Sequence, residues 1–508
     1  MATSPGTPAL SPTPPADTVH GPLDSLFMTM SGLGTEPATG RLLRGLMPYL
    51  DDRGAEQVFL LVERKRKEAW RESGETVSYQ ELVHWARDPE GGVYRGISTT
   101  GGRLEQQSLI AQFQKDPLGL VDWAAWQVEA AVISSAAPLW LETHFVDKPW
   151  GREGWYTGIE KRGVSRVRSP SGSTELPYAL AMFPWPLMGE AEGEPILLKT
   201  LEPRHEEVLG DLYLEVHEEK WETYLVLEID SNAWPDGTGC LLAGLDARVL
   251  ARYRKRHGTG AEAAMVGDLR EKIRVYEKLR REIDALADEA LSRRKRSASA
   301  EDDPGARQKA LAALPANLIN KEKKLRAQAE AFIGRHPLKL GDVACLPPGV
   351  LHSLQHGVKV VEFQTPTYER LIAMFAQKVV TQPHWDTDRA LQLMQKTPYT
   401  PPATVPVISP ETGVQRDQVV DFPQFQVLRT RLASGVRLAH PRKTEPAYCL
   451  LFVSAGKGRL LLANGDETPL AAGDACLLPA ALHDFTLESH KRSGLTYLLA
   501  HPRLAGTP

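Results

Sequence analysis

Two separated segments of the chain carry side chains that could bind a divalent metal ion. Residues 215–222 read EVHEEKWE, and residues 341–352 read GDVACLPPGVLH and end on an imidazole. Alternate residues of a strand share a face, so the first and third residues of the first segment can point to the same side. Two imidazole nitrogens and two carboxylate oxygens suit zinc, with iron(II) and manganese(II) as alternatives. The candidate metal ligands are Glu215, His217, Glu222 and His352.

The spacing within these segments strengthens the assignment, because a single histidine is more often an ordinary core or surface residue. The second segment follows the pattern Gly, five residues, Pro-x-Gly, two residues, His without a gap. The first segment follows the pattern His-x-His, four residues, Glu, with Glu215 in the place of the first histidine. The two patterns, in this order, resemble the two motifs of the cupin β-barrel. We expect Gly349 to supply the turn and Pro347 to fix the strand exit before His352.

The composition argues against several classes of protein. Lys and Arg number 60 against 64 Asp and Glu in 508 residues, and a net charge of −4 argues against a broadly cationic nucleic-acid binder. The four cysteines are isolated in the sequence, which favours reduced thiols in a cytoplasmic protein. No apolar run approaches the roughly 18 residues that span a bilayer, so we expect no membrane association.

The N-terminal part of the chain shows no residues with an evident chemical role. Residues 1–22 contain six prolines and are predicted to be a disordered tail, neither a signal peptide nor an anchor. Residues 23–139 are predicted to form a mixed or helical N-terminal region of unknown role. Within it, the capping-box pattern Ser78-Tyr-Gln-Glu81 predicts the start of a helix, and residues 120–132 predict another.

The middle of the chain predicts a β-barrel that is interrupted by helices. Short runs rich in Val, Leu, Tyr and Trp, separated by Gly, Pro and Asp, predict strands from residue 140 onward. We expect residues 140–243 and 337–400 to form the metal-binding barrel. Residues 244–336 predict a helical insertion, because apolar residues recur there at steps of three and four between Leu269 and Leu286.

An internal repeat predicts a second barrel over residues 401–508. Residues 473–479 read GDACLLP and repeat the pattern of GDVACLP at residues 341–347. The nearest histidine, His483, comes one residue too early, and no His or Glu occurs where the first motif should fall. We therefore expect a degenerate barrel that binds no metal. The predicted fold class is mainly β, with two cupin (jelly-roll) barrels, an inserted helical subdomain and a mixed N-terminal region.

A metal-binding cupin that is interrupted by helices and followed by a degenerate cupin resembles type I mannose-6-phosphate isomerase. Residues 148–153, KPWGRE, look like the Lys-Pro-Trp-Gly segment that opens the family's catalytic domain. KWETYLVL at residues 220–227 is similar to its KTECWYIL strand, and residues 341–354 match its GDxxxxPxGxxHAL motif. EFQTPTYER at residues 362–370 resembles its EIQQ…TYR run. The similarity covers roughly residues 140–500.

The resemblance implies roles for further residues. It implies one zinc ion per chain on the four ligands above, with Glu215 in place of a glutamine of the family. It leaves the catalytic base open between Lys220 and Glu362. The implied catalytic residues are Lys220, Glu362 and Arg370. The implied substrate-binding residues are Lys148, Trp150 and Arg152. A substantial loop of the family, between the histidine and Lys-x-Glu, is reduced here to the two residues Glu218-Glu219.

The resemblance further implies a zinc-dependent aldose–ketose isomerase, an intramolecular oxidoreductase that converts mannose 6-phosphate to fructose 6-phosphate. The expected partner is a small-molecule sugar phosphate, with no nucleic acid and no membrane, in a cytoplasmic monomer or homodimer. Two alternatives stay open. One is a metal-binding cupin that acts on another sugar or as an iron-dependent oxygenase, and the other is a non-catalytic sugar-binding cupin.

Overall fold

The computed structural model describes residues 18–35, 37–67, 76–88, 92–160, 163–191, 193–297, 306–379, 382–402, 404–407, 411–442 and 447–504. Of the segment predicted to be disordered, residues 1–17 lie outside this described part. Thr18–His20 forms strand β1, so the prediction of disorder up to residue 22 is wrong at its end. In the described part of the chain, no helix is both long enough and apolar enough to cross a membrane.

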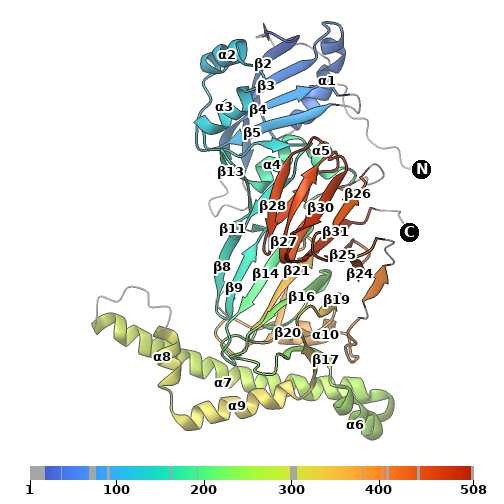
Figure 1. Cartoon of the computed structure of the whole chain (residues 1–508). Helices are drawn as coiled ribbons and strands as arrows, with labels where there is room; N and C mark the ends of the chain where they lie inside the picture. Colours follow the sequence, from blue (N-terminus) through green and yellow to red (C-terminus); the bar gives the residue numbers. More distant parts are fainter. Residues whose placement is uncertain are drawn as a thin grey trace, which may run out of the picture. The chain divides into compact units, whose positions relative to one another are not determined.

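The chain is mainly β and divides into two compact units, which are described separately (Figure 1). Unit 1 comprises Met1–His144, Trp155–Leu197 and Thr404–Pro508, and unit 2 comprises Phe145–Gly154 and Leu198–Ala403. Both units contain multistranded sheets, and unit 2 also carries a block of helices. The predicted fold class, mainly β with a helical insertion and a mixed N-terminal region, is confirmed.

The N-terminal region of unit 1 is a six-stranded sheet with helices on it. Its strands lie in chain order, with β2 and β3 parallel across α1 and the other neighbours antiparallel. Phe59 and Leu82 of the sheet share one apolar core with Phe113 and Leu120 of α2 and α3. The elements are β1 (Thr18–His20), β2 (Ser25–Leu33), α1 (Thr39–Asp51), β3 (Gln57–Lys67), β4 (Thr76–Ala86), β5 (Val93–Thr99), α2 (Gln106–Lys115), α3 (Leu120–Gln127) and β6 (Ile133–Ser134).

The helix predicted to start at Ser78 is wrong, because this segment is strand β4. All eleven residues of β4 pair with β3, and seven of them also pair with β5. A strand between two neighbouring strands forms backbone hydrogen bonds on both sides. This tertiary pairing outweighs a local capping pattern. The helix predicted over residues 120–132 exists but ends at Gln127.

The C-terminal part of unit 1 is a β structure built around one long strand, β27 (Cys449–Leu462). The first half of β27 pairs with β29 and β31, and its second half pairs with β28 and β30. Its apolar core includes Leu451, Val453, Leu487 and Tyr497. The other strands are β7 (Leu139–Glu142), β12 (Arg166–Ser169), β13 (Gly172–Glu175), β23 (Val405–Val407), β24 (Val414–Asp421), β25 (Phe425–Leu432), β26 (Arg437–His440), β28 (Glu467–Ala471), β29 (Ala475–Leu478), β30 (Phe485–Ser489) and β31 (Leu495–Pro502).

The structure groups residues 155–197 with unit 1, whereas the sequence analysis placed them in the metal-binding barrel. The reason is strand pairing. β12 pairs with β13 and β7, and β7 pairs with β29 of the C-terminal sheet. The remaining elements of this segment are β10 (Ile159–Glu160), β11 (Gly163–Val164), α4 (Leu176–Met182) and α5 (Pro184–Met188).

Unit 2 contains a six-stranded and a five-stranded sheet that share one core. The strand order is β19-β16-β21-β14-β9-β8 in the first sheet and β18-β17-β20-β15-β22 in the second. Tyr224 and Val360 of the first sheet lie in one apolar cluster with Leu241 and Leu354 of the second. The strands are β8 (His144–Lys148), β9 (Gly151–Trp155), β14 (Leu197–Pro203), β15 (Leu214–Val216), β16 (Glu222–Ile229), β17 (Gly239–Leu245), β18 (Ile333–Leu338), β19 (Val343–Leu346), β20 (His352–Leu354), β21 (Val358–Gln364) and β22 (Leu371–Met374).

The helices of unit 2 are inserted between β17 and β18, which pair with each other directly. Asp246 begins the insertion by accepting a hydrogen bond from the Val249 amide at 2.8 Å, an N-cap of α6. The predicted apolar stripe of the long helix α7 is buried at Leu269 and Ile273, whereas Leu286 at its far end is exposed. The helices are α6 (Ala247–His257), α7 (Ala261–Ser297), α8 (Ala306–Ala312), α9 (Ala316–Glu330) and, after β22, α10 (Thr387–Leu393).

Candidate metal centre

Strand pairing in unit 2 brings the two candidate histidines together. Glu215 of β15 stands directly opposite His352 of β20 in the five-stranded sheet, and His217 follows β15 by one residue. Glu222 opens β16 in the six-stranded sheet. Segments at least 130 positions apart in the sequence therefore place side chains close together.

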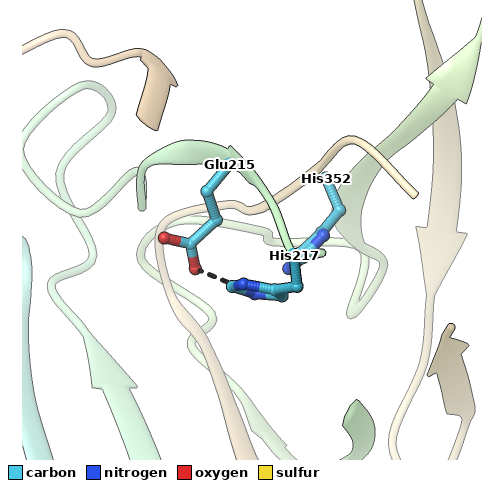
Figure 2. A group of neighbouring side chains, drawn as sticks. All are labelled: Glu215, His217 and His352. Carbon is cyan, nitrogen blue, oxygen red and sulfur yellow. Dashed lines mark ion pairs between the residues drawn. The ribbon is translucent and has the colours of Figure 1, made fainter. Parts of the chain in front are cut away.

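The four predicted ligands form a compact group. Ligand atoms of Glu215, His217 and His352 all lie within 4.8 Å of one another. Figure 2 shows these three side chains grouped together. His217 Nε2 lies 3.9 Å from Glu215 Oε1. Glu222 Oε2 lies 3.2 Å from His217 Nε2 and 3.3 Å from His352 Nε2, so Glu222 belongs to the same group.

Several ligand atoms of this group are buried and have no hydrogen-bond partner. These atoms are Glu215 Oε2, His217 Nε2, Glu222 Oε2 and His352 Nε2. Buried polar atoms are nearly always paired, and leaving them unpaired is costly. A divalent cation between them would bind one of these atoms from each side chain, while His217 Nδ1, which is also buried without a hydrogen-bond partner, would lie on the far side of its ring. The donor set of two imidazoles and two carboxylates therefore fits such an ion.

A hydrogen bond between the other ring nitrogen of His352 and the backbone supports this interpretation. His352 Nδ1 lies 2.9 Å from the carbonyl oxygen of Val350. A carbonyl can only accept, so Nδ1 carries the proton and Nε2 keeps a lone pair directed at the group. Histidines that bind metals are commonly oriented by such a bond on the other ring nitrogen.

The electrostatics of the group favour the deprotonated forms of Glu222 and His217 but not of His352. Burial opposes the charge of Glu222, but His217 and Lys220 outweigh it and hold the pKa of Glu222 well below its ordinary value. Burial lowers the pKa of His217, more than Glu222 raises it, which favours the neutral imidazole that binds a metal. Burial also works to lower the pKa of His352, but the carboxylate of Glu222, 3.3 Å from its Nε2, raises this pKa overall.

Three buried pairs of a lysine and a carboxylate lie on the six-stranded sheet or next to it. Each pair places the lysine Nζ within 3.2 Å of a carboxylate oxygen. The pairs are Lys220–Glu222 at 2.6 Å, Lys148–Glu153 at 2.8 Å and Lys199–Glu362 at 3.2 Å. Burial raises the pKa of Glu362 well above its ordinary value, Lys199 offsets only part of this, and the carboxylate of Glu222 adds to the rise.

Lys199 is a residue that the sequence analysis missed. It lies in β14, two strands from Glu222 in the sheet order, with β21 and Glu362 between them. A signal was present, because Lys199 interrupts the apolar run Ile196–Leu201, and all six residues of this run are buried. A charged residue in a fully buried strand requires a partner, which identifies it as a candidate for a functional role.

The remaining predicted residues occupy different environments. The guanidinium of Arg370 lies 4.7 Å from the ring centroid of Tyr213. Arg152 pairs with Glu202 and stacks on Phe145, with 49% of its side chain exposed. Trp150 is 1% exposed and belongs to the core of unit 2. Substrate contact by Lys148, Trp150 and Arg152 stays a prediction.

Comparisons with known proteins give structural neighbours only. No protein-family model matches the chain, and no curated protein matches its sequence. The chain is similar in structure to the mannose 6-phosphate isomerase from Bacillus subtilis, with 16% identity, a TM-score of 0.49, and coverage of 72% of this chain and 99% of that one. A mutant phosphomannose isomerase from Salmonella typhimurium gives 13% identity, a TM-score of 0.47, and coverage of 73% and 100%.

A mannose 6-phosphate isomerase bound with zinc and yttrium gives the same four values.

Proposed function

We propose that the chain is a metal-dependent aldose–ketose isomerase of sugar phosphates, with mannose 6-phosphate and fructose 6-phosphate as the first substrate pair to test. One observation carries the proposal. Two histidines and two glutamates from separate strands converge with unpartnered ligand atoms, next to buried lysine–carboxylate pairs. The structural neighbours that carry the name mannose 6-phosphate isomerase, one of them with zinc bound, point to the same reaction.

The reaction moves a proton between C1 and C2 of the sugar through an enediol. A divalent ion on Glu215, His217, Glu222 and His352 would supply positive charge that stabilises the developing enediolate. The four side chains would hold that ion at a largely buried place, where electrostatic interactions are strong. We propose zinc, with iron(II) or manganese(II) as the alternatives that the donor set also accepts.

The proton transfer needs a group that takes the proton and returns it. Glu362 is the first candidate, because burial raises its pKa well above the ordinary value and so makes its carboxylate a stronger base. Lys199, 3.2 Å from Glu362, orients the carboxylate. Lys220 is the second candidate base, although its Nζ is held 2.6 Å from Glu222.

The phosphate of the substrate needs a positive partner. Arg370 offers a planar set of donors that matches a phosphate, and its guanidinium lies 4.7 Å from the ring centroid of Tyr213. Lys148 is a further candidate, because it is buried and already pairs with Glu153. The cytoplasmic location and the monomeric or homodimeric state also remain predictions.

A second function is favoured by one feature of the ligand group. Glu215, His217 and His352 form a set of two histidines and one carboxylate, which in other proteins binds iron(II) for reactions with oxygen. An iron-dependent oxygenase is therefore the alternative. Oxygen uptake with iron as the native metal would favour it over the isomerase.

The test is a coupled isomerase assay over a panel of hexose and pentose phosphates, with metal analysis of the purified protein. We expect about one zinc ion per chain, ketose formation from mannose 6-phosphate, and loss of activity in chelator that returns with added metal. A protein that binds metal and sugar phosphate but turns over none of the panel would instead support a non-catalytic sugar-binding cupin.

A further inference from the structure

The short segment that joins two candidate ligands is held by contacts from other parts of unit 2. Residues 218–221 connect His217, after the end of β15, to Glu222, at the start of β16. β15 and β16 belong to different sheets, so this connection crosses from one sheet to the other. Because both flanking residues contribute to the metal group, the backbone path of the connection sets the separation of their ligand atoms.

A single carboxylate oxygen holds the middle of this connection. Oε1 of Glu369 accepts hydrogen bonds from the backbone amides of Glu219, at 2.5 Å, and Lys220, at 2.9 Å. Hydrogen bonds to a charged acceptor are stronger than those between neutral groups. Because one carboxylate oxygen binds two successive amides, it restrains the local backbone and not only a side chain.

The two ends of the connection are fixed by other groups. The Gly349 amide donates to the carbonyl of His217 at 2.8 Å. Thr365 exchanges two bonds with Trp221, one through its amide at 3.0 Å and one through its hydroxyl at 3.1 Å. Between these two ends, the amides of Glu219 and Lys220 are restrained by the hydrogen bonds that they donate to Glu369.

We propose that Glu369 is a positioning residue of the metal centre. By fixing the Lys220 backbone, it keeps Lys220 Nζ at 2.6 Å from Glu222 Oε1. Glu222 held in this way keeps its other oxygen 3.2 Å from His217 Nε2. The inference rests on the proposed metal binding, and it adds a residue that contacts neither the metal nor the substrate.

The experiment compares three variants at position 369 with the wild-type chain. Zn²⁺ affinity is measured by competition with a chromogenic chelator, and the Co²⁺-loaded protein is examined by visible absorption. We expect Glu369→Ala to lower Zn²⁺ affinity about tenfold, as loss of support behind a ligand typically does, and to alter the Co²⁺ spectrum. Glu369→Gln keeps an accepting oxygen, and we expect its affinity to stay within about threefold of wild type. In the isomerase assay, Glu369→Ala should lower kcat more than it raises KM.

A matched control lies on the same segment. Glu218 pairs with Arg389 at 2.5 Å, and their side chains are 42% and 64% exposed. An exposed pair of this kind contributes little, so Glu218→Ala should leave Zn²⁺ affinity and the Co²⁺ spectrum unchanged. If Glu369→Ala fails to fold, Glu369→Asp replaces it, because the shorter side chain keeps the charge but withdraws the oxygen from the two amides. We expect its Zn²⁺ affinity to fall as well.

Wild-type Zn²⁺ affinity and Co²⁺ spectrum in the folded Ala or Asp variant would overturn the proposal, and so would an equal loss in Glu218→Ala. The binding measurements do not depend on turnover. If the wild-type chain binds Zn²⁺ but isomerises no sugar phosphate, the proposed function fails, while the Zn²⁺ affinities still decide the role of Glu369.

Discussion

Glu215 and His352 are direct cross-strand partners in the antiparallel pair of β15 and β20. Facing residues in such a pair have side chains on the same side of the sheet, a few ångströms apart. This pairing makes a carboxylate and an imidazole neighbours although 136 residues separate them in the sequence. The metal group is thus a consequence of strand register, and a shift of one residue would direct one side chain to the other face.

His352→Gln should weaken metal binding without unfolding unit 2. The substitution removes a nitrogen ligand whose Nε2 has no other partner, so we expect Zn²⁺ affinity to fall by about 100-fold or more. Chelator competition measures the affinity, and circular dichroism checks the fold. The control is His384→Gln, which changes a side chain that is 66% exposed and should leave the affinity unchanged. Equal Zn²⁺ affinity in the two variants would count against His352 as a ligand.

Lys199→Met should reduce turnover and leave metal content unchanged. Lys199 Nζ lies 3.2 Å from Glu362 Oε2, so its loss affects the carboxylate that we propose as base. We expect kcat to fall by about 100-fold, the usual scale of general acid–base catalysis. Steady-state kinetics with mannose 6-phosphate and metal analysis of the variant test this. Loss of the metal in this variant would assign Lys199 to the metal site instead.

Glu215→Gln should change the preference among metals. The substitution removes one negative charge from the ligand group and replaces a carboxylate oxygen by an amide oxygen. Manganese(II) depends more on carboxylate oxygens than zinc does, so we expect Mn²⁺ affinity to fall further than Zn²⁺ affinity, by about tenfold. Paired titrations of both ions into the metal-free variant measure the difference. Equal losses for the two ions would show that the charge of Glu215 does not set the preference.

His84 should make the stability of the N-terminal sheet depend on pH. Burial, with a smaller contribution from Arg95, lowers the pKa of His84 to about 4 from 6.5. The unfolded chain therefore binds more protons between these values, so the stabilisation is present above about pH 6.5 and is lost as the pH falls toward 4. At pH 5 the loss relative to pH 7 is about 2 kcal/mol.

The measurement is urea denaturation of the wild-type chain at pH 7 and pH 5. It is followed by a probe in the N-terminal sheet, such as the fluorescence of Trp85, which neighbours His84 in β4. His84→Gln keeps a donor for Gln57, the 3.0 Å partner of His84 Nε2, and removes the titration. A wild type and a variant with the same pH dependence would refute the assignment.

The candidate ligands could be named from the sequence because each of the two motifs is local, whereas their convergence depends on the pairing of β15 with β20 and was expected only from the resemblance. The spacing from Gly341 to His352 encodes a strand, a turn and the next strand, and the structure has this order, with Gly349 at a positive φ of 81° that glycine adopts without strain. Glu215 and His217 likewise owe their shared direction to strand alternation. These features depend on neighbours along the chain.

Features that depend on pairing between distant strands could not be predicted. Lys199 acquires its role only because β14 pairs with β21 and brings Lys199 to Glu362. In the sequence, Glu369 is an ordinary charged residue. Only the fold places its carboxylate where it accepts a hydrogen bond from the amide of Lys220. The error at Ser78 has the same origin, because the pairing of β4 on both sides overrode a local helix signal.

The proposed metal centre can be tested with an anomalous diffraction map of crystals grown with Zn²⁺, recorded at the zinc edge. We expect one strong peak per chain, about 2.0–2.2 Å from a nitrogen of His217, a nitrogen of His352 and oxygens of Glu215 and Glu222. A map without a peak at these four side chains, or with its peak at another site, would contradict it.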